Sequence, residues 1–315
     1  MRGGERGAVL DLLETAFALR EVFELYMRHD PALRPEDMLL ALHDRRPVSC
    51  VQIFTKQVRL RGESLSLGGI GSVATDPGHR GRGLASELLR RADDEMRARG
   101  MALALLFSDR FSFYGRLGWL SVAQARLALH AQPGGSGSLS AGARIRPFQE
   151  TDRPAVERLY ERHAQPLETS TLRDRTYWEG QLRYAGNPDE EFQVIERDRH
   201  LVAYARKIVL YGVHTAMEYA CEPDATPDLA VLLATFAPSE GALVIPWTGN
   251  SALEEALQAR ARRLDRYDDG GSMWRVLDRA RLARLAGVPS STDDRALLEG
   301  LVGGPRALYW PSDRF

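Results

Sequence analysis

Residues 67–86 read LGGIGSVATDPGHRGRGLAS and pass from a strand-like segment through a polar turn into the start of a helix. Glycines at 68, 69 and 71 interrupt the apolar residues of the segment, and glycine inside a strand usually marks a bulge or a close approach of another segment. After Asp76 and Pro77, apolar residues recur at helical spacing from Leu84 to Met96 and stop before Gly100, a residue that commonly ends a helix. The sequence therefore predicts a strand, a turn and a helix in direct succession.

The turn that leads into this helix has the composition of an anion-binding site. A helix N-terminus presents unpaired backbone N–H groups and the positive end of the helix dipole. Glycines let a ligand approach the backbone closely, and arginines add positive charge. We therefore expect a pyrophosphate to bind here; the alternative is an arginine-rich surface turn without a ligand. The residues concerned are Arg80, Gly81, Arg82, Gly83, Leu84 and Ala85.

The spacing within the turn separates this site from two common nucleotide-binding motifs. The turn contains neither the G-x-x-x-x-G-K-[ST] phosphate loop nor the G-x-G-x-x-G dinucleotide fingerprint. Arg80, Gly83 and Ala85 instead fit R/Q-x-x-G-x-G/A, and a strand-like run, Met101 to Phe107, and an aromatic turn, Phe113 to Trp119, follow. This region resembles the GCN5-related N-acetyltransferases (GNAT), whose motif binds the pyrophosphate of coenzyme A. The resemblance implies acetyl-CoA as the cosubstrate. The histidines are scattered without metal-ligand spacing, so no metal ion is expected.

Composition limits the classes of partner. The formal net charge is −1, so no global attraction to nucleic acid or to anionic membranes is expected. Cys50 and Cys221 lie far apart in apolar segments, which indicates buried free thiols in a reducing compartment. No apolar run is long enough to span a bilayer and no signal-peptide pattern begins the chain, so we expect a cytoplasmic location. The expected partner is a small-molecule or peptide amine, and a homo-oligomer is left open.

The length of 315 residues allows two domains and an appendage. A first, catalytic domain is expected over residues 1–130, beginning with a helical stretch from Val9 to Tyr26. A Gly- and Ser-rich linker is predicted for residues 131–142, followed over residues 143–272 by a second domain with the same order of elements. The last helix of that domain is predicted from Ser251 to Leu264, with Ser251 and Glu254 as a capping box. Residues 273–315 are expected to form a short α/β appendage.

The second domain lacks the phosphate turn. The corresponding segment contains Pro223, Asp224, Pro227 and Asp228 and no glycine, and carboxylates there would repel a pyrophosphate. We therefore interpret it as a degenerate GNAT-like domain that does not bind coenzyme A and either walls the substrate cleft or is a purely structural partner. A tandem of this kind resembles the enhanced-intracellular-survival type of acetyltransferase, with a shortened C-terminal piece. The expected fold class is mixed α+β and α/β, with a central mixed sheet flanked by helices in each domain.

Acetyl transfer to an amine requires an oxyanion site, an acid and a base. Backbone N–H groups of Val73, Ala74 and Thr75 are expected to bind the pantetheine and thioester like an added strand. The resemblance places Tyr114 as the acid for the thiolate, a role that suits a phenol of reference pKa near 10; the alternative is a packed aromatic side chain. The tandem family implies a base in the carboxylate of the last residue, here Phe315, and the alternative is a merely packed tail.

The identity of the acceptor is the least determined property of the sequence. The family suggests an aminoglycoside or another cationic small molecule, and a protein or peptide lysine or N-terminus is the alternative. A non-catalytic acetyl-CoA sensor is a hypothesis of another class. Acidic residues that either line a pocket for a cation or are ordinary surface charges are Asp30, Glu36, Glu218 and Asp313.

Overall fold

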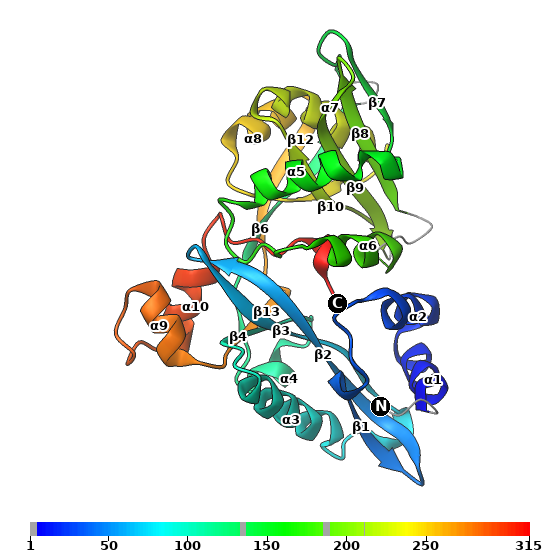
Figure 1. Ribbon diagram of the computed structural model, residues 1–315, viewed down its shortest axis with the longest axis vertical. Coiled ribbons are helices and arrows are strands. Elements are labelled where there is room, and N and C mark those ends of the chain that lie inside the picture. Colours follow the sequence, from blue (N-terminus) through cyan, green and yellow to red (C-terminus); the bar gives the residue numbers. More distant parts are fainter. Residues whose placement is uncertain (1–4, 133–136, 185–189, 211) are drawn as a thin grey trace.

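A computed structural model describes residues 5–132, 137–184, 190–210 and 212–315, which form two mixed β-sheets flanked by helices (Figure 1). The expected fold class is thereby confirmed. The first sheet has the order β1-β2-β3-β4-β13-β5 and the second the order β12-β6-β11-β10-β9-β8-β7. The strands are β1 (Met38–His43), β2 (Arg46–Leu60), β3 (Glu63–Thr75), β4 (Leu103–Phe107), β5 (Leu120–Ser121), β6 (Gln124–Ala131), β7 (Ala143–Pro147), β8 (Glu191–Arg197), β9 (His200–Leu210), β10 (Val213–Cys221), β11 (Leu243–Pro246), β12 (Ala261–Asp269) and β13 (Ser272–Val276). The α-helices are α1 (Arg6–Phe17), α2 (Arg20–His29), α3 (Leu84–Ala98), α4 (Phe111–Gly115), α5 (Arg153–Ala164), α6 (Arg175–Tyr184), α7 (Thr226–Phe236), α8 (Ser251–Gln258), α9 (Arg279–Ala286) and α10 (Asp294–Val302).

The strand, turn and helix predicted around residues 67–86 are β3, the turn that follows it and α3. The helix crosses over to β4, which pairs with β3 in parallel. Leu103 and Leu105 of β4 enter one core cluster, whereas Ala104 and Leu106 enter the cluster that contains Leu88 and Leu89 of α3. This strand is therefore buried on both faces, as an apolar run in a parallel pair requires.

The two sheets exchange strands. After β5 the chain enters the second sheet as β6, which lies between β11 and β12, and after β12 it returns to the first sheet as β13, between β4 and β5. The sheets therefore do not follow the domain boundaries expected at residues 130, 142 and 272. The division into domains itself stays a prediction. Part of the expected linker, residues 133–136, lies outside the described residues.

Two expected helices differ from the structure. The N-terminal stretch is broken at Ala18, which takes a left-handed conformation (φ 55°) and separates α1 from α2. The helix expected over residues 251–264 is wrong in its second half, because α8 ends at Gln258 and β12 begins at Ala261. The N-cap of α8 is Asn250, whose side-chain oxygen accepts a hydrogen bond from the Leu253 N–H, and not Ser251.

The C-terminal segment lies between the two halves of the molecule (Figure 1). Trp310 packs in the core of the second sheet, with its ring 5.1 Å from that of Tyr219, while Tyr309 packs in the core of the first. The helices α9 and α10 cover the first sheet through Leu282 and Leu298, which contact the cluster around Trp274. The tail is thus held by both cores, and this directs the last residues of the chain toward the first sheet.

The two cysteines are free thiols, as expected. Cys50 is fully buried, and burial raises the pKa of its thiol to about 12, whereas Cys221 is only half-buried.

Candidate active site

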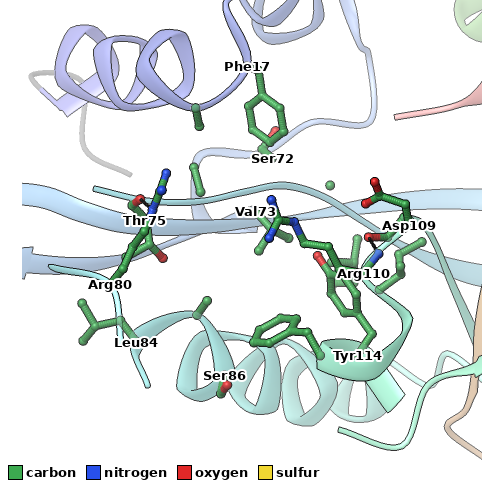
Figure 2. A pocket seen from close by; sticks show the side chains of 18 of the residues that line it. Phe17, Ser72, Val73, Thr75, Arg80, Leu84, Ser86, Asp109, Arg110 and Tyr114 are labelled. Carbon is green, nitrogen blue, oxygen red and sulfur yellow. Dashed lines mark hydrogen bonds between the residues drawn. The ribbon is translucent and has the colours of Figure 1, made fainter. Parts of the chain in front are cut away.

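A cavity of about 960 Å³ opens between β3, the N-terminus of α3, the segment from β4 to α4 and the corner between α1 and α2 (Figure 2). Every residue expected from the sequence to bind the coenzyme or take part in catalysis lines it. The structure therefore brings the predicted residues together, while their roles stay predictions. These residues are Val73, Ala74, Thr75, Arg80, Gly81, Arg82, Gly83, Leu84, Ala85, Tyr114 and Phe315.

The strand β3 presents an open edge to the cavity. Its pairing with β4 ends at Ile70 and Leu106, but β3 continues to Thr75. The register with β2 shifts between Cys50 and Gln52, and Ser72 has a positive φ of 51°, which defines a β-bulge. Beyond Ile70 no strand of the described residues pairs with this edge, so an extended ligand can be bound there as an added strand.

The turn before α3 is held in shape by Asp76. Its carboxylate accepts hydrogen bonds from the Gly78 N–H (2.9 Å) and from His79 Nδ1 (3.0 Å), and the His79 bond is the main cause that lowers the pKa of Asp76. Gly81 and Gly83 have φ values of 78° and 77°, in the left-handed region where a side chain is strained. Because the N-cap Gly83 has no side chain to fold back over the helix end, the first N–H groups of α3 remain available to a ligand.

Tyr114 combines a buried ring with an available hydroxyl. The side chain is 7 % exposed and packs edge-on against Phe113, with ring centroids 4.9 Å apart. Burial raises the pKa of its phenol to about 12. Among the described residues no group forms a hydrogen bond with this hydroxyl, although Tyr114 lines the cavity. A phenol in this position stays protonated at neutral pH and is positioned to donate to a ligand.

The C-terminal residue explains two of the glycines in β3. The Phe315 ring stacks on Phe54 with centroids 5.2 Å apart, and a Cβ at position 69 would come within 2.5 Å of that ring. A Cβ at position 71 would lie 3.1 Å from the Phe315 main-chain oxygen. Gly69 and Gly71 therefore make room for the last residue, which is the close approach that the glycine pattern predicts.

A buried ionic network holds the segment immediately before Phe315. Arg173 binds both Asp313 (2.9 Å) and Glu218 of β10 (2.5 Å), and the Tyr177 hydroxyl donates to Asp313 (3.0 Å). Burial alone would raise the pKa of Glu218, but Arg173 and Arg206 outweigh it and lower that pKa to about 2. A further bond from the Tyr26 hydroxyl to the Arg314 carbonyl (3.0 Å) fixes the chain one residue before its end.

The acidic residues considered for the acceptor pocket do not line the cavity. Asp30 is buried against Lys56, with 3.2 Å between carboxylate oxygen and ammonium nitrogen, and Glu218 and Asp313 belong to the Arg173 network. Glu36 is exposed outside the cavity. Three of the four are therefore neither pocket ligands nor surface charges.

Sequence reasoning missed two parts of the lining. The corner between α1 and α2 contributes Ala16, Phe17 and Phe23, and the end of β4 leads to Asp109 and Arg110. The second group had a usable signal, because the carboxyl end of a parallel strand beside a phosphate turn is a common place for ligand-binding residues. The first depends on the left-handed corner at Ala18, which no sequence pattern marks.

In the part of the chain that the structure describes, no group of three or more His, Cys, Asp or Glu side chains is arranged to hold a metal ion. No described helix is long and apolar enough to cross a membrane. The expected absence of a metal and the cytoplasmic location stay predictions.

Comparison with known proteins gives the same architecture. Residues 1–122 match a family model described as an acetyltransferase (GNAT) domain. A crystal structure of a protein of unknown function from Enterococcus faecalis, described as a probable N-acyltransferase, has a TM-score of 0.68 at 18% identity over 88% of this chain and 72% of that one. The chain has a tandem GNAT fold. A search of curated proteins found no match.

Two other solved structures are also similar in fold to this chain. The GCN5-related N-acetyltransferase from Kribbella flavida has a TM-score of 0.67 at 17% identity, over 91% of this chain and 72% of that one. Eis1 from Mycobacterium abscessus has a TM-score of 0.56 at 16% identity, over 84% of this chain and 72% of that one. At such identities the likeness concerns the fold alone.

Proposed function

We propose that the protein is an acyl-CoA-dependent N-acyltransferase that transfers an acetyl group from acetyl-CoA to a primary amine. The observation that carries the proposal is that one cavity is lined both by the open turn at the start of α3 and by the Tyr114 phenol and Phe315. The match of residues 1–122 to an acetyltransferase (GNAT) domain supports it.

The coenzyme would lie along the open edge of β3. The pyrophosphate binds the N–H groups of residues 81–85, with Arg80 and Arg82 adding charge, and Arg80 is already oriented by a bond from its Nε to the Thr75 carbonyl (3.3 Å). The pantetheine arm then follows Val73 to Thr75 as an added strand. The acetyl thioester thereby reaches the bulge at Ser72, where β3 and β4 part.

The reaction would proceed by direct attack in a ternary complex. The Phe315 carboxylate takes a proton from the acceptor ammonium, and the neutral amine attacks the thioester carbon to form a tetrahedral oxyanion, which a β3 backbone N–H stabilises. The carbon–sulfur bond then breaks, Tyr114 protonates the departing thiolate, and the proton lost by the new amide nitrogen returns to the phenolate through solvent. The products are the N-acetylated amine and free coenzyme A, with one proton released.

The acceptor proposed from the family is an aminoglycoside or another cationic small molecule, and the second candidate is a peptide lysine or N-terminus. An acetyl-CoA sensor would have no use for a proton donor. The available Tyr114 hydroxyl therefore favours an enzyme over a sensor.

The test is thiol release from acetyl-CoA by untagged protein, with amino acids, monoamines, polyamines, aminoglycosides and lysine peptides as acceptors. Calorimetric titration with coenzyme A is run beside it. We expect coenzyme binding together with turnover on one class of amine. Coenzyme binding without thiol release on any class would support the sensor instead, and absence of coenzyme binding would refute both.

A further inference from the structure

The charge of the cavity lining is opposite to what a polycationic acceptor needs. Among the described residues that line the cavity, Asp109 is the only acidic side chain, and the one other anionic group is the Phe315 carboxylate. The basic side chains of the lining are His79, Arg80, Arg82, Arg110 and Arg116. Even with two arginines assigned to the coenzyme pyrophosphate, two others remain. These two, Arg110 and Arg116, equal the two anionic groups in number, so a ligand with several ammonium groups would find no excess of opposite charge in the lining.

Buried carboxylates elsewhere in the molecule do not change this balance. Asp30 is neutralised by Lys56, and Glu218 and Asp313 are neutralised by Arg173. All of these side chains are nearly inaccessible to solvent. Long-range attraction of a polyamine to the cavity thus has no source in these groups.

The corner between α1 and α2 gives the cavity an apolar wall. The rings of Phe17 and Phe23 lie 5.4 Å apart, and Ala16 is beside them in the lining. Phe17 is 37 % exposed, and Figure 2 shows its ring directed at the bulge around Ser72 and Val73. When the apolar body of a ligand covers an exposed phenylalanine, binding is stabilised by about 25 cal/mol for each Å² of apolar surface removed from water. The wall therefore favours an acceptor with an apolar or aromatic body.

Arg110 supplies a second recognition element on the side of the cavity where the chemistry takes place. Figure 2 shows Arg110 and Tyr114 together on one side and Arg80 and Leu84 on the other. Arg110 is exposed, and among the described residues its guanidinium forms no ion pair. The planar guanidinium matches a carboxylate in a two-bond arrangement. It is therefore available to an anionic group of the acceptor rather than to the pyrophosphate at the far side.

From these three features we infer that the acetyl acceptor is an α-amino acid with an apolar side chain. Its ammonium faces the Phe315 carboxylate, its carboxylate binds Arg110, and its side chain packs on Phe17 and Phe23. The inference rests on the proposed function and keeps its primary amine, but it replaces the polycationic acceptor suggested by the family with a molecule that has one amine, one carboxylate and an apolar body.

The experiment compares matched acceptors in the thiol-release assay. L-Phenylalanine is paired with phenethylamine, which lacks only the carboxylate, and with glycine, which lacks the apolar body; spermidine and kanamycin represent polycations. We expect kcat/KM for phenylalanine to exceed that for each of the other four at least tenfold. Higher activity on spermidine or kanamycin, or equal activity on phenylalanine and phenethylamine, would overturn the inference while leaving an N-acetyltransferase. No thiol release with any of the five or with lysine peptides would refute the proposed function as well.

Arg110→Gln tests the carboxylate contact separately. We expect the KM for phenylalanine to rise about tenfold, with kcat, the KM for acetyl-CoA and the rate on phenethylamine unchanged. The matched control is Arg90→Gln, which removes another exposed arginine from the part of α3 outside the cavity and should change none of these values. An equal loss on both acceptors, or a higher KM for acetyl-CoA, would assign Arg110 to the coenzyme or to folding and overturn its role in acceptor binding.

Discussion

The two sheets contain the same crossover with different turns. In the first, β3 leads through Gly81 and Gly83 into α3 and on to the parallel strand β4; in the second, β10 leads into α7 and on to the parallel strand β11. The start of α3 opens on the cavity, whereas most residues of α7 are buried. The crossover is thus a property of the fold, and its turn decides whether a ligand can bind.

The acidic residues of the second turn have structural partners. Asp224 pairs with Arg197 (2.5 Å), and the buried Asp228 accepts a hydrogen bond from the Ser140 N–H (2.8 Å). The second crossover thus has carboxylates near the start of its helix, where the first has Arg80 and Arg82. This supports the interpretation of the second half as a degenerate domain.

The largest expected difference between the halves concerns two buried tyrosines. Tyr114→Phe should lower kcat by about 100-fold or more, because it removes the proton donor, and leave the affinity for coenzyme A unchanged. Tyr219→Phe, which removes a hydroxyl bonded to the Pro246 carbonyl (2.6 Å), should keep kcat and lower the free energy of unfolding by about 1 kcal/mol. Thiol release and urea unfolding of both variants make the comparison. An unchanged kcat in Tyr114→Phe would remove Tyr114 from the mechanism.

A smaller difference is expected for the arginines at the two turns. Arg80→Glu should weaken coenzyme A binding about 10- to 100-fold, since it places a carboxylate beside the pyrophosphate. Arg197→Glu should lower stability, because it faces Asp224 and Asp228, and leave coenzyme affinity unchanged. Calorimetric titration and urea unfolding separate the two effects. Equal coenzyme affinity in Arg80→Glu and the wild type would contradict the placement of the pyrophosphate.

The smallest expected effect is a loss of stability in alkali. The folded pKa of Tyr114 is about 12, above the unfolded value near 10, so the contribution of this phenol is fully present below pH 10 and is lost as pH rises from 10 to 12. At pH 11 the loss amounts to about 1 kcal/mol. Urea unfolding at pH 8 and pH 11 should therefore show that the free energy of unfolding falls less between these two pH values in Tyr114→Phe than in the wild type. Identical decreases would mean that the phenol is not desolvated in the folded protein.

Local patterns in the sequence predicted the first crossover and most of the cavity. The glycines of β3, the apolar spacing of α3 and the turn between them act over a few residues, so sequence spacing is sufficient to place them. The helix expected beyond Gln258 was wrong because β12 is mostly exposed and lacks the apolar alternation that identifies a strand.

The exchanged strands and the acceptor side of the site depend on contacts that spacing does not encode. Pairing of β4 with β13 joins segments more than 160 residues apart in the sequence. Burial of Asp30 and Asp313 depends likewise on Lys56 and Arg173, which are distant in the chain. Phe17 reaches the cavity only because Ala18 turns the chain between two helices.

The return of β13 to the first sheet also has a consequence during synthesis. When the ribosome has made β4, the strand that pairs with its far edge has not yet been translated. At about 5–20 residues per second, roughly 10 to 30 s pass before Ser272–Val276 follow. During that time an apolar strand edge is open to pairing with other nascent chains. The half of the molecule that is translated first can therefore complete its sheet only when nearly the whole polypeptide has been made, and its yield in cells should depend on chaperones that cover this edge.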